Sequence, residues 1–398
     1  MSKLEELIQK YCPDGVEWKI LNSITEQFSG MTGVSNKWAE SGNCQFIDYN
    51  NVYKHLSVDI TALKYATVKS LNQNVLKQGD ILFTSASETP DECALAAVIE
   101  DEITEGIFLD DHLFGLRLLK EYENAISPSF LKYAFHSEQF RTQVRKVVRG
   151  VTRNYVSKTD FMRLEIPIPP LPVQEEIVRV LDNFTELQTE LQAELQKRLQ
   201  QYNYYKEEIL THFSPEQNAK EYKLGDICEL GTGSHNTQDG LKEGSYPFYT
   251  RGIDVLYLNS YDFDETAIIT AGDGAGVGKV FHYVKGKYAL HQRAYRIVPI
   301  QSKVLARYLY YYLETEFYAY IMKSSVSSSV TSIRKPMLLD FPVLLPSLAE
   351  QQRIVDILDR FDSLTNDLTA GLPAEIEKRR QQYEFYRDKL LTFKRITK

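Results

Sequence analysis

The sequence has no long hydrophobic run and little cysteine. No apolar segment of the 398-residue chain reaches the 18 or more residues that a membrane-spanning helix needs. The N-terminal MSKLEELIQKYCPDG is amphipathic and lacks the apolar core of a signal peptide. The four cysteines (Cys12, Cys44, Cys93 and Cys228) form no CxxC pair and have no metal-ligand spacing. We therefore expect free thiols in a reducing cytoplasm.

Catalytic motifs are also missing. The sequence contains no HExxH, GxSxG, paired-carboxylate or Asn-Pro-Pro-aromatic motif, and its seven histidines are scattered. The segment GDGAGVGKV (272–280) fails as a P-loop, because Asp273 replaces the first glycine and Val280 replaces the Ser or Thr. A tight glycine-rich hairpin that lets the backbone approach a ligand is the better interpretation. The sequence thus predicts no catalytic residue, no metal site and no cofactor site in this chain.

The chain also lacks an excess of positive charge, with 46 Lys and Arg against 54 Asp and Glu. The formal net charge of −8 argues against a protein that coats nucleic acid by bulk charge. It does not exclude a local basic face, because groove recognition depends on where the charges lie.

One pattern occurs twice. IVRVLDNFTEL (177–187) matches IVDILDRFDSL (354–364), and QQYNYYKEEILTHF (200–213) matches QQYEFYRDKLLTF, which ends at Phe393. Weaker likenesses precede them, between 111–119 and 290–298, with His112 over His291, and between 130–135 and 305–310. A chain of two halves follows, each a globular module and a long helical region: 1–168 with 169–213, and 214–345 with 346–398.

Apolar residues recur every three or four places from Val173 to Phe213, which predicts an amphipathic helix of roughly 60 Å. The second helix begins near Leu348 and is expected to be irregular at Gly371–Leu372–Pro373. Leucines every fourth place (Leu187, Leu191, Leu195 and Leu199) favour pairing of the two helices. The modules contain short strand-like runs and a helix near 128–147 and 303–322. The predicted fold is α+β: two mixed modules, with long helices that pair as an antiparallel coiled coil in a pseudo-twofold repeat.

A local basic strip stands out in the first module. RTQVRKVVRGVTRNYVSKTDFMR (141–163) has five Arg and two Lys against one Asp, with Asn, Ser and Thr interleaved, and KSSVSSSVTSIRK (323–335) lies at the same place in the second module. These residue types bind phosphates and base edges. A solvated helix end and loop is the alternative. The candidate DNA-binding residues are Arg145, Lys146, Arg149, Arg153, Asn154, Lys158, Lys279, Lys323, Thr331, Ser332, Arg334 and Lys335.

The repeated helix ends carry aromatic clusters. Tyr204 and Tyr205 in the first copy, and Phe385 and Tyr386 in the second, could stack on bases. Because they lie on helices, we favour core packing and a protein–protein interface for them.

The whole chain resembles the specificity subunit of Type I restriction–modification systems. The matching features are YCPDGVEWK near the N-terminus, two P-x-x-x-Q-x-x-IV-x-x-LD-x-F helix openings and the paired QQY ends. The second opening departs from the pattern, with Ser347 in place of the Pro170 of the first.

This resemblance implies that each module is a target recognition domain that reads one half of a split DNA sequence. It implies that the paired helices set the gap between the half-sites and dock two modification subunits, which use S-adenosylmethionine to methylate adenine at N6. Restriction subunits that need ATP and Mg²⁺ would join that core. Two other classes stay open: a coiled-coil protein scaffold without DNA readout, and a self-sufficient methylase.

Overall fold

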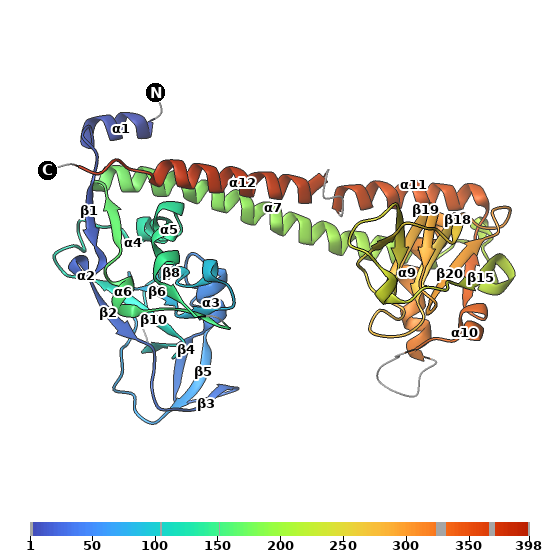
Figure 1. The fold of residues 1–398 in the computed structure, drawn as a ribbon, viewed down its shortest axis with the longest axis horizontal. Coiled ribbons are helices and arrows are strands. Elements are labelled where there is room, and N and C mark those ends of the chain that lie inside the picture. Colours follow the sequence, from blue (N-terminus) through green and yellow to red (C-terminus); the bar gives the residue numbers. More distant parts are fainter. Residues whose placement is uncertain (1–2, 104–105, 151, 324–331, 366–370, 397–398) are drawn as a thin grey trace. The chain divides into compact units, whose positions relative to one another are not determined.

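The structure is a computed structural model that describes residues 3–103, 106–150, 152–323, 332–365 and 371–396. The chain divides into two compact units, one made of residues 1–190 and 376–398 and the other of residues 191–375. Figure 1 shows that each unit contains a module of strands and short helices and a share of the long helices. Within the described ranges, no helix combines the length and the apolar character needed to cross a bilayer.

The first module is built on a four-stranded sheet with the order β2-β10-β6-β8. These strands are β2 (Thr25–Ser29), β10 (Leu113–Leu118), β6 (Ile81–Thr84) and β8 (Ala96–Val98). All four residues of β6 are buried, as expected for a strand that is covered on both faces. On one face, Phe83 joins Phe114, Phe135, Phe140 and Phe161 in ring contacts of 4.9–5.9 Å.

Further sheets and helices complete this unit. Its other strands are β3 (Val34–Ala39), β5 (Lys64–Val68), β4 (Cys44–Ile47) and β9 (Ile107–Leu109) in one sheet, β11 (Val148–Arg149), β12 (Asn154–Val156) and β7 (Ala86–Ser87) in another, and the pair β1 (Glu17–Ile20) and β13 (Glu165–Ile168). Its helices are α1 (Lys3–Tyr11), α2 (Leu21–Ile24), α3 (Tyr49–Lys54), η1 (Pro90–Glu92), α4 (Pro128–Ala134), α5 (Glu138–Val147) and α6 (Lys158–Phe161). The helix predicted over 128–147 is therefore two helices, α4 and α5.

The second module has a six-stranded sheet with the order β15-β20-β18-β19-β16-β17. Its strands are β15 (Cys228–Thr232), β20 (Ala294–Pro299), β18 (Phe263–Ala271), β19 (Phe281–Leu290), β16 (Tyr246–Tyr249) and β17 (Leu256–Leu258), and β14 (Lys220–Lys223) pairs separately with β21 (Pro342–Leu345). The helices are η2 (Pro215–Gln217), α8 (Leu224–Ile227), η3 (Thr237–Asp239), α9 (Ala306–Lys323) and α10 (Lys335–Leu339). Helix α9 packs on β18, β19 and β20 through buried aromatic side chains such as Tyr308 and Phe317.

The two modules share a four-strand core, which confirms the predicted internal repeat. The order β2-β10-β6-β8 in the first corresponds to β15-β20-β18-β19 in the second. The entrances correspond as well: the Leu21 N–H donates to the Leu164 carbonyl at 2.9 Å, and the Leu224 N–H donates to the Phe341 carbonyl at 2.8 Å. The α+β fold prediction is therefore confirmed.

The register of one of the weaker likenesses was wrong. The turn before β10 is closed by the Leu113 N–H on the Asp110 carbonyl, and the turn before β20 by the Ala294 N–H on the His291 carbonyl, each at 3.0 Å. The counterpart of His291 is therefore Asp110, not His112. Runs of similar apolar residues can be matched in more than one register, and the backbone hydrogen bonds decide between them.

The long helices are α7 (Leu171–Thr211), α11 (Leu348–Thr365) and α12 (Gly371–Leu391). In the first unit, Phe184 of α7 stacks on Tyr386 of α12 with ring centroids 5.4 Å apart, and Glu176, nearer the start of α7, lines a groove with Lys389, nearer the end of α12. The two segments thus run antiparallel. Helix α12 begins at Gly371, where φ is +76°, so the predicted interruption is confirmed.

The second unit repeats this pairing with α11. The ring centroids of Tyr202 in α7 and Phe361 in α11 lie 6.2 Å apart, and Tyr202 shares a core with Ile354 and Leu358. The leucines at every fourth place in α7 are half-buried. They therefore keep some apolar surface accessible in the single chain.

Candidate nucleic-acid interface

The basic strip of the first module forms a hairpin at the edge of the core. Helix α5 ends at Val147, and β11 and β12 then pair antiparallel around a turn that contains Gly150. Gly150 has φ +119°, and a Cβ there would lie 2.1 Å from the Arg153 carbonyl oxygen, so the turn requires glycine. Strand β12 also pairs with β7, with Tyr155 opposite Ala86. The hairpin is thereby anchored to the module.

Two arginines at this hairpin are open to solvent. The side chain of Arg149 is 60% exposed, and its nearest carboxylate, Asp160, is 3.7 Å away. Arg153 is also exposed and lines a cavity of about 700 Å³ with Tyr49 and Tyr53, whose rings stack at 5.7 Å. A guanidinium beside aromatic rings suits a phosphate or a nucleobase. Lys146, at the end of α5, is exposed too.

The other basic residues of the strip are engaged within the module. Arg145 bonds Asp91 at 2.5 Å and Glu138 at 2.6 Å, and these carboxylates, Glu138 first, raise its pKa. Arg141 is buried and donates to three backbone carbonyls, at 2.7 to 2.8 Å. Counting charges along 141–163 therefore overstates the positive surface. A DNA contact through Arg145 stays a prediction, and it would have to compete with two internal ion pairs.

Asn154 and Lys158 are half-buried. The Asn154 side-chain amide donates to the Glu88 carbonyl at 2.8 Å, which holds the hairpin against the segment after β7. The Lys158 ammonium bonds the Ser29 hydroxyl at 3.2 Å and lies 5.8 Å from the centre of the Phe114 ring. Burial lowers the pKa of Lys158.

The glycine-rich segment of the second module is a hairpin, as predicted. It connects β18 to β19, and Thr270 and Phe281 form the last strand pair before it. The close approach is to the protein itself: a Cβ on Gly278 would lie 2.4 Å from Ile321 of α9. Lys279 is exposed on this hairpin, with its ammonium 5.0 Å from the centre of the Tyr318 ring.

Residues 332–335, at the end of the serine-rich segment, correspond to the last residues of the basic strip around β12 and α6 in the first module. Ser332 forms a bridge to Asp273, and the Ile333 N–H donates to the Gly272 carbonyl at 2.9 Å, as the Val156 N–H does to Ser85 at 3.2 Å. Lys335 begins α10 as Lys158 begins α6. Lys323, Ser332, Arg334 and Lys335 are exposed, and Thr331 lies outside the described residues.

Sequence reasoning missed a polar cluster beside this segment. Asp273 accepts a bond from Arg251 at 2.7 Å and another from Arg293 at 3.0 Å. Arg251 and Arg293 line a cavity of about 230 Å³, together with Asn236 and Gln292. The sequence feature that could have indicated this cluster is the turn His291–Gln292–Arg293, which is rich in amide and arginine side chains. Nothing in the sequence indicated that residues 236, 251 and 273 would lie beside that turn.

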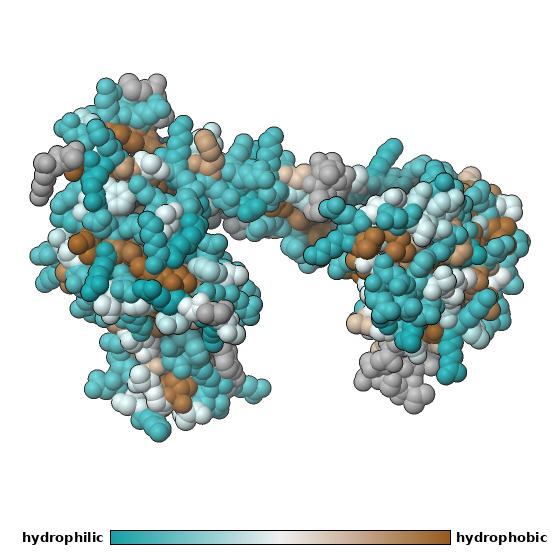
Figure 2. Space-filling model, viewed as in Figure 1, coloured by the Kyte–Doolittle hydropathy of each residue, from teal (hydrophilic) through white to brown (hydrophobic). Residues whose placement is uncertain are grey.

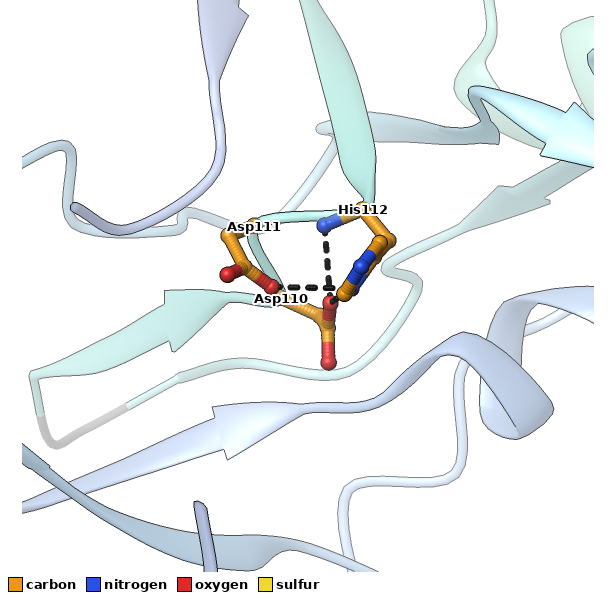
Figure 3. A group of neighbouring side chains, drawn as sticks. All are labelled: Asp110, Asp111 and His112. Carbon is orange, nitrogen blue, oxygen red and sulfur yellow. Dashed lines mark hydrogen bonds and ion pairs between the residues drawn. The ribbon is translucent and has the colours of Figure 1, made fainter. Parts of the chain in front are cut away.

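The matching turn of the first module is acidic. Asp110, Asp111 and His112 converge there, and Figure 3 shows their side chains turned toward one another. The Lys37 ammonium lies 3.1 Å from both carboxylate oxygens of Asp110 and also pairs with Asp111. The chain itself thus supplies one positive charge, Lys37, against the two carboxylates of this turn.

The repeated aromatic clusters are partly exposed in both units, although Tyr386 also stacks on Phe184 of α7. Tyr202 and Tyr383 are buried, whereas Tyr204 and Phe385 are each 63% exposed. The Tyr204 and Tyr205 rings lie 5.4 Å apart at 73°, and the Phe385 and Tyr386 rings 5.4 Å apart at 76°. The prediction that these four residues bind a partner is untested, but their exposure fits it. Elsewhere, hydrophilic side chains dominate the face of each unit drawn in Figure 2.

Residues 13–201 and 216–378 each match the family described as Type I restriction modification DNA specificity domain. Because the two matches together cover most of the chain, it belongs to this family.

Three relatives illustrate the likeness. The Type I restriction enzyme EcoR124I/EcoR124II specificity subunit of Escherichia coli is 33% identical over 61% of this chain, and the match spans 66% of that protein. A putative specificity subunit of Haemophilus influenzae is 32% identical over 61% of this chain and 68% of its own length. A putative specificity subunit of Mycoplasma pneumoniae is 29% identical over 58% of this chain and 97% of its own length.

Solved structures share the fold. An S subunit from M. genitalium aligns with a TM-score of 0.54 and 15% identity over 95% of this chain and 96% of that one. A chain from a study of complex assembly and conformational transition of the type I R-M system aligns with a TM-score of 0.66 and 17% identity over 95% of this chain and 98% of that one.

Proposed function

We propose that this chain is the sequence-specificity subunit of a Type I restriction–modification complex in the cytoplasm. Each module reads one half of a split DNA target, and the chain itself supplies no catalytic group. The long helices set the spacer and dock two modification subunits, which carry S-adenosylmethionine and methylate adenine at N6. Restriction subunits, with ATP and Mg²⁺, join this core where they are present.

The observation that carries this proposal is that exposed basic residues recur beside equivalent strand pairings in the two modules. Tyr155 lies opposite Ala86 in the first module, and Ser332 lies opposite Asp273 in the second. Exposed basic residues surround both segments: Arg149 and Arg153 in one, and Arg334 and Lys335 in the other. Two equivalent surfaces on one chain suit a target with two halves.

Salt-dependent DNA binding tests the proposal. The chain, in complex with its modification subunits, is titrated with duplex DNA at about 50 to 200 mM salt. Over this range, affinity that depends on phosphate contacts falls measurably. We expect the logarithm of the affinity to fall linearly with the logarithm of salt concentration. The double variant Arg149→Ala/Arg153→Ala should make that slope shallower by about 2, because each arginine contacts one phosphate.

Lys120→Ala is the matched control, because it removes an exposed positive charge outside the hairpin. Its slope should equal that of the unsubstituted chain. A protein scaffold without DNA readout would give no salt-sensitive affinity, and it would show no difference between the two variants.

A further inference from the structure

The second module contains a small polar cavity that the basic-strip argument does not use. Its volume is about 230 Å³, and we call it the amide–arginine pocket after the residues that define it: Asn236, Gln238, Arg251, Gln292 and Arg293. The pocket gathers residues from η3, from the segment after β16 and from the turn before β20. Amide and guanidinium groups are the side chains that pair best with base edges in the major groove.

Backbone hydrogen bonds hold the pocket together. The Gln292 N–H donates to the His235 carbonyl at 2.9 Å, and the His235 N–H donates to the Leu290 carbonyl at 3.3 Å. The Gln292 side-chain amide donates to the side-chain oxygen of Asn236. These bonds fix the two amides beside each other. Their remaining donor and acceptor atoms can serve a ligand.

A hydrogen bond from the backbone to the His291 side chain holds the turn that carries Arg293. It is buried, and its Nδ1 accepts a hydrogen bond from the Arg293 N–H at 3.0 Å. Burial lowers the pKa of His291, so the ring is neutral at pH 7 and remains an acceptor. The backbone that carries Arg293 is thereby set before any ligand arrives, which reduces the entropy lost on binding.

The two arginines of the amide–arginine pocket share one carboxylate, and Asp239 of η3 lies beside the same turn. Asp273 is the carboxylate that both Arg251 and Arg293 contact, at 2.7 and 3.0 Å. The guanidinium groups, Arg251 first, lower the pKa of Asp273, so it stays ionised. Only Nη1 of Arg293 is used in this contact, and its side chain is 63% exposed. Its other N–H groups can donate outward as a fork.

The corresponding turn of the first module carries a different set of side chains. Asp110 and Asp111 stand there, with Lys37 between them. The same structural position therefore offers donors in one module and acceptors in the other. Two half-sites of different sequence are the expected consequence.

We propose that the amide–arginine pocket reads the DNA half-site of the second module, with Arg293 bonding O6 and N7 of a guanine and Asn236 and Gln292 facing the adjacent base pair. The inference rests on the proposed function and assigns a base-reading residue within it. A phosphate contact is the competing role for Arg293. Lysine can replace arginine on a phosphate, but it cannot reproduce the two-pronged bond to guanine.

Methylation mapping of variants tests this assignment. The complex is produced in a methylation-free host with Arg293→Ala, Arg293→Lys or the unsubstituted chain, and N6-methyladenine is mapped by long-read sequencing. We expect both variants to relax one G·C position in one half of the motif. The preference for guanine there should fall about 10- to 100-fold, and the other half and the spacer should stay unchanged. Lys285→Ala, an exposed lysine on β19, is the control and should leave the motif intact.

Three results would overturn the assignment. Guanine readout is excluded if the half of the motif that responds to Arg293→Ala contains no G·C pair. An unchanged motif in both variants, with less methylation only for Arg293→Ala, shows a phosphate contact. A complex that assembles but gives no motif with the unsubstituted chain removes the proposed function itself, and is thus distinguishable from the other two. Co-purification of each variant with the modification subunits verifies folding.

Discussion

Gln174 accepts a hydrogen bond from the backbone N–H of Ser127 through its side-chain oxygen, at 2.8 Å. Gln351 repeats this contact in the second unit, where it accepts from the Leu305 N–H at 2.9 Å. Each glutamine is fully buried at the start of a long helix, and each also donates to the carbonyl of a proline that precedes that helix, Pro169 or Pro346. The two glutamines thus hold the start of a long helix against the adjoining module in the same way, Gln174 in α7 and Gln351 in α11.

Replacing this glutamine should destabilise its unit. Gln174→Ala leaves the Ser127 N–H and the Pro169 carbonyl without their partner in a buried place. We expect the free energy of unfolding to fall by about 2 to 4 kcal/mol, because buried polar groups lose their hydrogen bonds. Calorimetry or denaturant titration measures the change. Gln196→Ala, an exposed position on the same helix, should change it by less than about 0.5 kcal/mol. Equal effects of the two substitutions would refute the role of the buried contact.

A second prediction concerns acid stability of the first unit. Glu176 contacts Arg179 at 2.6 Å and Lys3 of α1 at 2.8 Å, and these cations, Arg179 first, lower its pKa to about 2. A carboxyl whose pKa is depressed by folding stabilises the folded state above its unfolded pKa. That contribution is lost as the pH falls from about 4.5 toward 2. The stability difference between the unsubstituted chain and Glu176→Gln should be constant above pH 5 and shrink below it. A difference that grew on acidification would contradict this account.

The third prediction concerns the exposed aromatic pairs. Tyr204→Ala/Tyr205→Ala and Phe385→Ala should each weaken binding of the modification subunit by about 10- to 100-fold, as loss of large aromatic side chains from an interface does. Tyr386 is left unchanged, because it stacks on Phe184 within the chain. The DNA motif should not change. Affinity is measured by titration with the purified modification subunit. Tyr222→Ala removes an exposed tyrosine on β14 and serves as control. Unweakened assembly in both variants would show that the partner docks elsewhere.

The fourth prediction concerns the repeated tetrads of α7. Removing Thr189–Gln192 shortens the helix by about 6 Å and rotates the C-terminal part of the helix by about 40°. Since 6 Å is close to two base pairs of DNA, the nonspecific spacer of the target should shorten while both half-sites stay the same. Methylation mapping of the deletion variant measures this. Altered half-sites with an unchanged spacer would show that the helix does not act as a ruler.

The sequence was most informative where the pattern is local. Helix periodicity predicted the long helices, because a helix that buries one face has apolar residues at a fixed spacing. The paired QQY ends predicted the repeat. The basic strip was only partly informative: Arg149 and Arg153 are exposed, but Arg141 is buried against backbone carbonyls. A residue's charge does not reveal whether the chain itself supplies its partner.

The amide–arginine pocket could not have been found in this way. Asn236, Asp273 and Arg293 come from separate loops, and strand pairing brings them together. Likewise, the registers of the weaker repeats depend on which carbonyl each N–H meets, as at Asp110 and His291. Contacts between residues that are distant in the chain follow from topology, which no local pattern encodes.

The most direct test of the central claim is a methylation map of a methylation-free host that expresses this chain with its modification subunit. The account predicts N6-methyladenine in a split motif, with one modified adenine in each half, and its complete loss when this chain is omitted. The same methylation without this chain, or none despite a stable complex of the chain with the modification subunit, would contradict it.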